Sequence, residues 1–233
     1  MGQIPFLMKK ILVAILLLLL IFSGGYFVRR HFWGLHSRLI NARKEVKQLV
    51  LSQEIKDGDL IFQTSLSKQS RAIQLATKSQ YSHCGLIFKR DSEYYVFEAV
   101  QPVKFTPLEN WIAKGQDGKF VVKRLKNTAE ALTPGVLQKM LDIAEQFKGK
   151  NYDLTFEWSD DKIYCSELIW KIYQRASGIE IGKLQKLRDF DLTNPAVKKK
   201  MNERYGDKVP LDENVISPAA VFNSELLETV KSN

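Results

Sequence analysis

The chain has 233 residues, 45% of them hydrophobic, and a formal net charge of +9, so it is long enough to build a core of its own. Nine basic and two acidic residues before position 57 give that segment +7, which leaves +2 for residues 57–233. A nucleic-acid surface needs basic residues gathered on one face of the fold, so this distribution argues against such a partner. Two cysteines and three histidines without zinc-ligand spacing predict neither a metal site nor another cofactor.

Residues 1–30 are predicted to be a membrane anchor or a signal segment. Residues 11–28 form an 18-residue run without a charge, close to the ~20 residues that span a bilayer as a helix. A hydrophobic N-terminal helix that stays as an anchor is favoured over a cleaved signal peptide, because Tyr26-Phe27-Val28 continue the run past the small residues Ser23-Gly24-Gly25. Residues 31–56 read as a basic amphipathic helix, either a stalk or a segment on the membrane surface.

Residues 57–233 are predicted to form one α+β domain. A short strand over 60–62 and a helix over 67–77, which Ser67 is expected to cap, are followed by two strands joined at a turn near residue 91. The remaining elements are a short helix over 107–113, a strand over 120–125, and helices that begin near Thr133, Cys165, Asn194 and Ser217. Helices on both sides of consecutive strands favour an antiparallel sheet or small barrel packed against helices.

Cys165 stands at the apparent start of an amphipathic helix that Gly178 is expected to end. Unpaired backbone N–H groups and the helix dipole favour a negative charge in a first helical turn. This position therefore lowers the pKa of a thiol, and the thiolate is the nucleophilic form. Taken alone, a cysteine on a helix is more often a buried structural residue.

His83 is the one histidine after the N-terminal segment, at the point where a loop becomes a strand. A thiolate nucleophile is commonly served by a histidine base, so His83 is the candidate partner of Cys165. Neighbouring residues of a strand point to opposite faces. We therefore expect Cys84 to face away from the site, into the core with Leu86 and Phe88, which argues against a Cys84–Cys165 disulfide.

Glu98 is a carboxylate within an otherwise apolar strand, Tyr94 to Val100. A short turn between this strand and the preceding one places residue 98 opposite a residue near 86, close to His83. A carboxylate in that position can accept from the imidazole and fix its orientation. The alternative is a charge that faces water from an edge strand.

Four short segments carry a family resemblance: Asp57-Gly58-Asp59-Leu60-Ile61-Phe62, Tyr81-Ser82-His83-x-Gly85, Tyr95-Val96-Phe97-Glu98-Ala99-Val100 and Tyr164-Cys165-Ser166-Glu167-Leu168. In this order they resemble the circularly permuted papain-like cysteine hydrolases of the YiiX type, in the NlpC-type superfamily that includes lecithin:retinol acyltransferase-like enzymes. The resemblance implies that Cys165 is the nucleophile, His83 the base and Glu98 the polar third member of the catalytic triad. It also implies that the protein is exported, so we expect residues 57–233 on the extracytoplasmic side. The basic residues that follow the apolar run would by themselves favour a cytoplasmic location for this domain.

The expected reaction is hydrolysis or acyl transfer at an amide or ester bond, with the oxyanion held at the start of the Cys165 helix. Tyr164 is a candidate substrate-binding hydroxyl or else a core residue. The substrate is expected to be a membrane lipid or acyl amide, or a cell-envelope peptide, with Phe156, Trp111 and Trp158 as candidates to line an apolar cleft. The alternatives are a membrane-anchored binding protein without catalysis and a redox protein that uses both cysteines.

Overall fold

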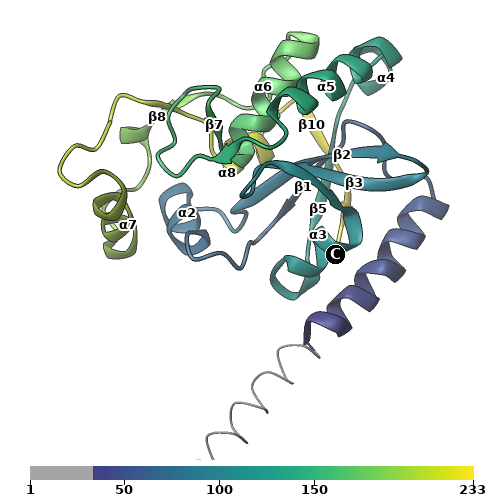
Figure 1. Cartoon of the computed structure of the whole chain (residues 1–233), viewed down its shortest axis with the longest axis horizontal. Helices are drawn as coiled ribbons and strands as arrows, with labels where there is room; N and C mark the ends of the chain where they lie inside the picture. Colours follow the sequence, from purple (N-terminus) through teal and green to yellow (C-terminus); the bar gives the residue numbers. More distant parts are fainter. Residues whose placement is uncertain (1–33) are drawn as a thin grey trace, which may run out of the picture.

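The computed structural model describes residues 34–233 (Figure 1). Its centre is a six-stranded antiparallel sheet in the order β10-β5-β1-β2-β3-β4, whose outer strands do not pair with each other. The strands are β1 (Leu60–Gln63), β2 (His83–Arg90), β3 (Glu93–Glu98), β4 (Lys104–Pro107), β5 (Val121–Leu125) and β10 (Leu227–Ser232). The fold is therefore α+β with an open sheet, so the small barrel that the sequence also allowed is not formed.

Helices and small ribbons surround this sheet. The helices are α2 (Ser70–Thr77), α3 (Leu108–Lys114), α4 (Thr128–Ala131), α5 (Pro134–Phe147), α6 (Cys165–Ser177), α7 (Pro195–Tyr205) and α8 (Pro218–Phe222), with single 3-10 turns η1 (Gln116–Gly118) and η2 (Leu187–Asp189). Two-residue ribbons are formed by β6 (Asn151–Tyr152) with β7 (Lys162–Ile163), and by β8 (Gln185–Lys186) with β9 (Asn214–Val215).

The two faces of the sheet bury different sets of apolar side chains. Leu86 and Phe88 of β2 lie in the larger core with α5 and α6. Ile87, between them in the chain, lies in the second core with Trp111 of α3. Figure 1 shows α5 and α6 on one side of the sheet and α3 on the other. Neighbouring residues of β2 therefore point to opposite faces of the sheet. One face is covered by α6, which carries Cys165, and the other by α3.

A helix over residues 34–51 precedes the sheet and packs against it, close to β10 at the C-terminal end of the chain. Ala42 and Leu49 are buried in the second core, with Leu39 and Val46 half-buried beside them. Lys231 Nζ lies 3.5 Å from Glu45 Oε1. The predicted helix in this region therefore contributes side chains to the folded domain. The predicted span at 11–28 lies outside the described residues, and within 34–233 no helix is long and apolar enough to cross a membrane.

Most helix starts predicted from local sequence are confirmed, and one is wrong. Thr133 Oγ1 accepts from Val136 N at 3.4 Å, and the Asn194 side chain accepts from Ala196 N at 3.0 Å, each just before a proline that opens its helix. The predicted cap at Ser67 is not used, because α2 begins at Ser70 with Gln69 before it. Ser70 is buried and its hydroxyl contacts that of Ser82 at 2.6 Å, so a tertiary contact sets this helix start.

Candidate active site

Cys165 is the first residue of α6, as the sequence predicts. Tyr164 before it is extended, with φ −108°, and Gly178 ends the helix in the left-handed region, with φ 75°. The Tyr164 amide donates to Glu167 Oε2 at 3.4 Å, which ties the first helical turn to the residue that precedes it. The backbone amides at this end of α6 are thus directed at the space around the Cys165 sulfur.

His83 is the first residue of β2, and the β2–β3 hairpin places it beside Glu98. Leu86 pairs with Phe97, so Gly85 lies opposite Glu98. A Cβ on Gly85 would lie 2.3 Å from Val96 Cγ1 and 2.9 Å from the Phe97 carbonyl oxygen. Glycine at this position therefore leaves the room in which the side chains of His83 and Glu98 meet across the strand pair.

Three donors converge on the buried carboxylate of Glu98. His83 Nε2 lies 2.6 Å from Glu98 Oε2, which also accepts from Trp111 Nε1 at 2.9 Å, and Thr106 Oγ1 donates to Oε1 at 2.6 Å. Glu98 is 2% exposed, so the alternative of an edge charge facing water is wrong. The indole of Trp111 also stacks on the His83 ring, with centroids 5.8 Å apart. The sequence offered Trp111 only as a candidate to line a cleft and did not single out Thr106, because only the packing of the sheet and α3 brings both side chains to Glu98.

His83 also interacts with Cys165, and since its Nε2 faces Glu98, its Nδ1 is left for the sulfur. Burial alone lowers the pKa of His83, but the hydrogen bonds to Cys165 and Glu98 outweigh it and raise that pKa to about 10. The pKa of Cys165 is held well below its usual range by a hydrogen bond from Cys84 and by His83, against the effect of burial. Both shifts favour a thiolate beside an imidazolium at neutral pH.

Cys84 occupies an unexpected place. Its side chain lies in the larger core with Leu86 and Phe88, as alternation predicts. That core is also where α6 packs, and Cys165 belongs to it. Cys84 therefore lies near Cys165 and is the first of the groups that lower its pKa. The prediction that Cys84 faces away from the site is therefore wrong. Both thiols are free, and burial raises the pKa of Cys84 well above its usual range.

A haloacetamide at neutral pH is expected to alkylate Cys165 at least about tenfold faster than Cys84, because the pKa of Cys165 is lowered and that of Cys84 is raised. Each unit by which a thiol pKa lies above the ambient pH lowers its thiolate fraction about tenfold. Peptide mass spectrometry over a time course measures the two rates in the native protein. Equal rates, or faster modification of Cys84, would contradict the protonation states described above.

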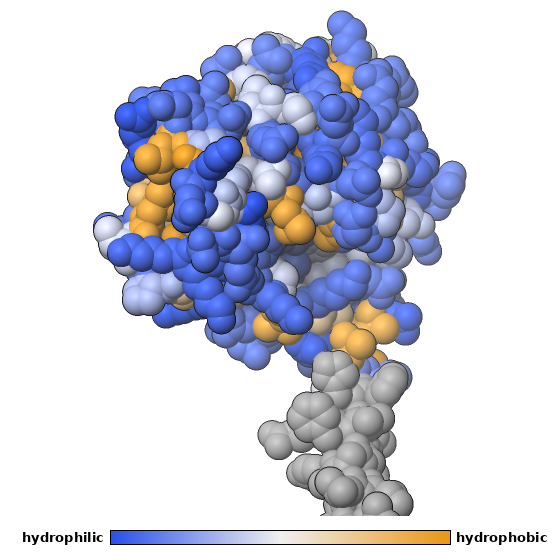
Figure 2. Space-filling view, turned by 60° about the vertical axis from the view of Figure 1, so that its left-hand side comes forward, coloured by the Kyte–Doolittle hydropathy of each residue, from blue (hydrophilic) through white to orange (hydrophobic). Residues whose placement is uncertain are grey.

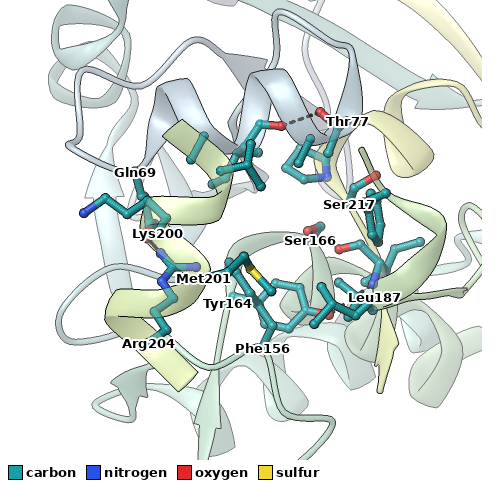
Figure 3. A pocket seen from close by; sticks show the side chains of 18 of the residues that line it. Gln69, Thr77, Phe156, Tyr164, Ser166, Leu187, Lys200, Met201, Arg204 and Ser217 are labelled. Atoms are coloured by element: carbon teal, nitrogen blue, oxygen red, sulfur yellow. Dashed lines mark hydrogen bonds between the residues drawn. The ribbon is translucent and has the colours of Figure 1, made fainter. Parts of the chain in front are cut away.

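Cys165 also lies in the wall of a pocket between α2, α7 and the start of α6 (Figure 3). Most of the surface that the pocket presents is apolar, although polar and charged residues also line it, namely Gln69, Thr77, Ser166, Lys200, Arg204 and Ser217. Apolar contributors include Ala72, Ile73, Ala76, Phe156, Leu187, Phe190, Leu192, Val197, Met201, Val215 and Ile216. On the side of the molecule that carries α2 and α7, Figure 2 shows apolar residues interrupting a mainly hydrophilic surface.

The sequence candidates for this cleft separate in the structure. Phe156 lines the pocket, whereas Trp111 and Trp158 are not among its lining residues. Trp158 packs on Trp170 with centroids 5.2 Å apart. Tyr164 also lines the pocket, but it is only 2% exposed and its hydroxyl oxygen accepts from Ile216 N at 3.1 Å. The Tyr164 hydroxyl thus anchors the segment that precedes α8.

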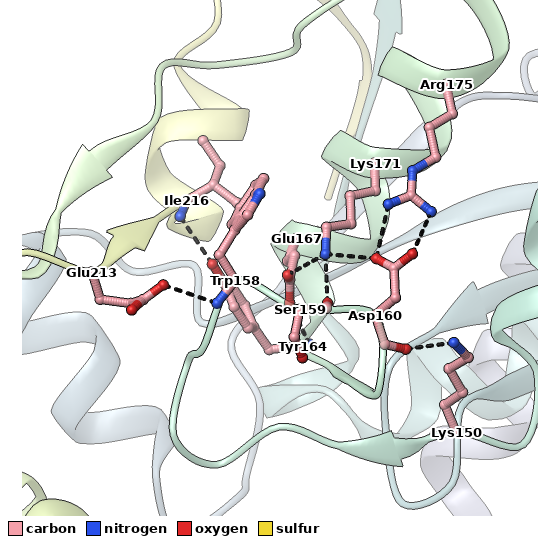
Figure 4. Close-up of polar contacts among 10 residues, drawn as sticks. All are labelled: Lys150, Trp158, Ser159, Asp160, Tyr164, Glu167, Lys171, Arg175, Glu213 and Ile216. Carbon is pink, nitrogen blue, oxygen red and sulfur yellow. Dashed lines mark hydrogen bonds and ion pairs between the residues drawn. The ribbon is translucent and has the colours of Figure 1, made fainter. Parts of the chain in front are cut away.

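A charged cluster outside the pocket holds the loop before Cys165 against α6 (Figure 4). Lys171 Nζ lies 2.7 Å from Glu167 Oε1 and 3.0 Å from Asp160 Oδ1, and Arg175 makes two contacts of 2.8 Å to Asp160. Burial raises the pKa of Glu167 to about 8 despite Lys171, whereas hydrogen bonds from Arg175 and Lys171 lower the pKa of Asp160. These contacts fix the position of the helix start that carries the sulfur.

Comparison with known proteins finds relatives of this chain. The chain is 52% identical over 173 residues to an uncharacterized protein YiiX of Escherichia coli K12, covering 74% of this chain and 84% of that protein. A crystal structure described as metalloprotein yiiX from Escherichia coli O157:H7 superposes with a TM-score of 0.74 at 51% identity, covering 77% of this chain and 98% of that one. Within residues 34–233 of this protein, no three His, Cys, Asp or Glu side chains are arranged to hold a metal ion.

The family model that matches describes a permuted papain-like amidase, YaeF/YiiX, of the C92 family, and it covers residues 54–231. This stretch begins just before β1 and runs into β10, so it includes the whole central sheet, α6 and the pocket. It also has His83 ahead of Cys165 in the chain, which is the order that the sequence motifs indicated. The chain belongs to the C92 family of permuted papain-like amidases and is a thiol hydrolase.

Proposed function

We propose that this protein hydrolyses the amide bond of an acyl amide with a long apolar chain, with Cys165 as nucleophile. The observation that carries the proposal is the place of Cys165 in the wall of an apolar pocket. An acyl chain in that pocket would present its carbonyl carbon to the sulfur. A cell-wall peptide carries many polar groups, and a wall whose surface is mainly apolar would leave most of them without partners.

In the proposed reaction, the Cys165 thiolate attacks the carbonyl carbon and forms the C–S bond. The His83 imidazolium gives its proton to the leaving nitrogen as the C–N bond breaks. His83 then takes a proton from water, which attacks the thioester and releases the carboxylic acid. Glu98 holds the imidazole in place throughout and stabilises its positive charge. The backbone amide of Cys165 is one donor to the oxyanion.

The environment of the substrate is part of the same proposal. A membrane lipid is the most accessible source of long acyl chains, and a chain anchored through residues 11–28 would keep the pocket near it. The orientation follows the predicted export, so the domain would face the extracytoplasmic side. Both points remain predictions, and a protease-protection assay on sealed membrane vesicles tests the orientation.

The substrate proposal is tested with amides of one amine and saturated acids of increasing length. We expect kcat/KM to rise by up to about fourfold per methylene, since burying a CH₂ contributes about 0.8 kcal/mol. Ala76→Trp, which places an indole in the pocket wall, should remove this dependence on length and leave the shortest amide unaffected. Product release is measured by chromatography.

Ala196→Trp is the matched control, because Ala196 is exposed on α7 and does not line the pocket. It should keep the wild-type dependence on chain length. A flat dependence in the wild type, together with turnover of peptidoglycan stem peptides, would replace the acyl-amide proposal with the cell-envelope peptide. Binding of acyl amides without turnover would favour a binding protein of this fold.

A further inference from the structure

The positive charge in the wall of the pocket beside Cys165 comes from Lys200 and Arg204 of α7. Figure 3 shows these two side chains on one side of the pocket, across from Leu187 and Ser217. Among residues 34–233, no Asp or Glu belongs to the wall. One edge of a mainly apolar pocket therefore carries a concentrated positive charge, which favours a negatively charged ligand group there.

Arg204 is half-buried and forms no ion pair with any of residues 34–233. Glu203, its neighbour in the chain, pairs with Lys200 instead. The polar contact that Arg204 makes in the described part of the chain is with a neutral group, since its Nη2 donates to Gln69 Oε1 at 2.7 Å. Because a guanidinium presents several N–H donors in a planar fork, most of its hydrogen-bonding capacity remains for a ligand.

Two contacts hold this guanidinium in one orientation. Its Cζ atom lies 4.7 Å from the centroid of the Phe156 ring. The Gln69 amide that accepts from Arg204 donates in turn to the Tyr152 hydroxyl at 2.8 Å, and Tyr152 lines the same pocket as Cys165. The fork is therefore fixed in advance at the pocket that holds the sulfur, so little side-chain freedom is lost when an anion binds.

The two sides of the pocket suit different parts of an acyl amide. A methylene chain is stabilised by burial against an apolar wall such as that formed by Leu187, Phe190 and Val215. The same chain would leave a guanidinium without a polar partner. Arginine forms short, often bidentate hydrogen bonds with carboxylates and phosphates. The group that suits the α7 edge is thus an anion on the other side of the scissile bond from the acyl chain.

We propose that the amide substrate carries an anionic group, a carboxylate or a phosphate, on its leaving amine, and that the guanidinium of Arg204 binds this group. The inference rests on the proposed function and narrows its substrate class. Lys200 adds positive charge at the same edge, but its ion pair with Glu203 makes it the weaker contributor. The anionic group makes and breaks no bond, and it leaves with the amine when the C–N bond breaks.

Binding of matched amides tests this proposal without turnover. The full-length chain with Cys165→Ser, in an uncharged detergent, is titrated in a calorimeter with octanoylglycine and its methyl ester. A second pair is octanoyl-aminoethyl phosphate and octanoyl-ethanolamine. We expect the charged member of at least one pair to bind about 10- to 100-fold more tightly, the range of a hydrogen bond to a charged group. The pair with the larger ratio identifies the anion as a carboxylate or a phosphate.

Arg204→Gln, added to Cys165→Ser, removes the charge, while its amide can still donate to Gln69. The ratio of charged to neutral affinity should fall to about threefold or less. Arg204→Lys keeps the charge without the planar fork, so it should give an intermediate ratio. An arginine whose role is only to pack on Phe156 and hold Gln69 would leave the ratio unchanged. Circular dichroism of each sample measures folding.

Arg71→Gln is the matched control, because Arg71 is exposed on α2 and does not line the pocket. It makes the same change of charge and should keep the ratio measured without it. Equal affinities within both pairs before Arg204 is changed, an unchanged ratio in Arg204→Gln, or an equal loss in Arg71→Gln would each overturn the inference. If octanoyl amides bind no better than acetyl amides, the proposed function fails, and the ratio within the acetyl pairs still decides the role of Arg204.

Discussion

Cys165→Ser is expected to lower kcat/KM for acyl amides by about 10⁴-fold or more, the scale seen when the nucleophile of a hydrolase is removed. A serine hydroxyl keeps the shape of the side chain but is not ionised at neutral pH, so the resting thiolate–imidazolium pair is lost. Hydrolysis by purified protein and circular dichroism of the same sample measure activity and folding. A folded variant with the wild-type rate would remove Cys165 from the mechanism.

Cys84→Ser is the matched control for this substitution. It changes sulfur to oxygen at the residue in contact with Cys165 and keeps a hydroxyl donor there. We expect activity within about tenfold of the wild type, because the serine hydroxyl still donates to the Cys165 thiolate. An equal loss in the two variants would instead support a shared redox function of the two thiols, which a thiol count on the native protein would detect.

His83→Ala is expected to lower kcat/KM at neutral pH by about 10²- to 10⁴-fold, the contribution of a positioned general acid–base group. In the wild type, the ion pair of Cys165 and His83 exists at pH values between the lowered pKa of Cys165 and the pKa of His83, which is about 10. Activity is therefore expected to fall at alkaline pH, as the imidazolium loses its proton. Without His83, the pKa of Cys165 rises, and the pH at which alkylation of Cys165 is half-maximal moves upward. Alkylation rates across pH measure this shift.

Glu98→Gln tests how far the charge of Glu98 supports the ion pair of His83 and Cys165. The amide oxygen can still accept from His83 and Trp111, while the amide nitrogen can donate to Thr106, so the fold is expected to survive. Loss of the negative charge lowers the pKa of His83, and the alkaline limit of activity therefore moves below about 10. We expect a loss of about 10- to 100-fold, the value of a hydrogen bond to a charged group. An unchanged pH profile would show that Glu98 does not raise the pKa of His83.

The pairing of His83 with Glu98 was accessible from the sequence because a short hairpin leaves little freedom of register. Once the turn near residue 91 is fixed, strand alternation decides which side chains share a face. The hairpin is observed with that register. The same reasoning failed for Cys84, because alternation places a side chain on a face of the sheet but does not say which helix covers that face. The packing of α6 there brings Cys84 to Cys165.

The sequence by itself determined the helix start at Cys165, the hairpin that joins His83 to Glu98 and the permuted order of the motifs. These features depend on interactions between residues close in the chain, namely caps, turns and strand alternation. Only the tertiary structure decided the apolar pocket, the buried donors on Glu98 and the place of Cys84 near Cys165. Glu98, Thr106 and Trp111 come from β3, β4 and α3, and nothing local in the chain specifies a contact that forms only when those elements pack together.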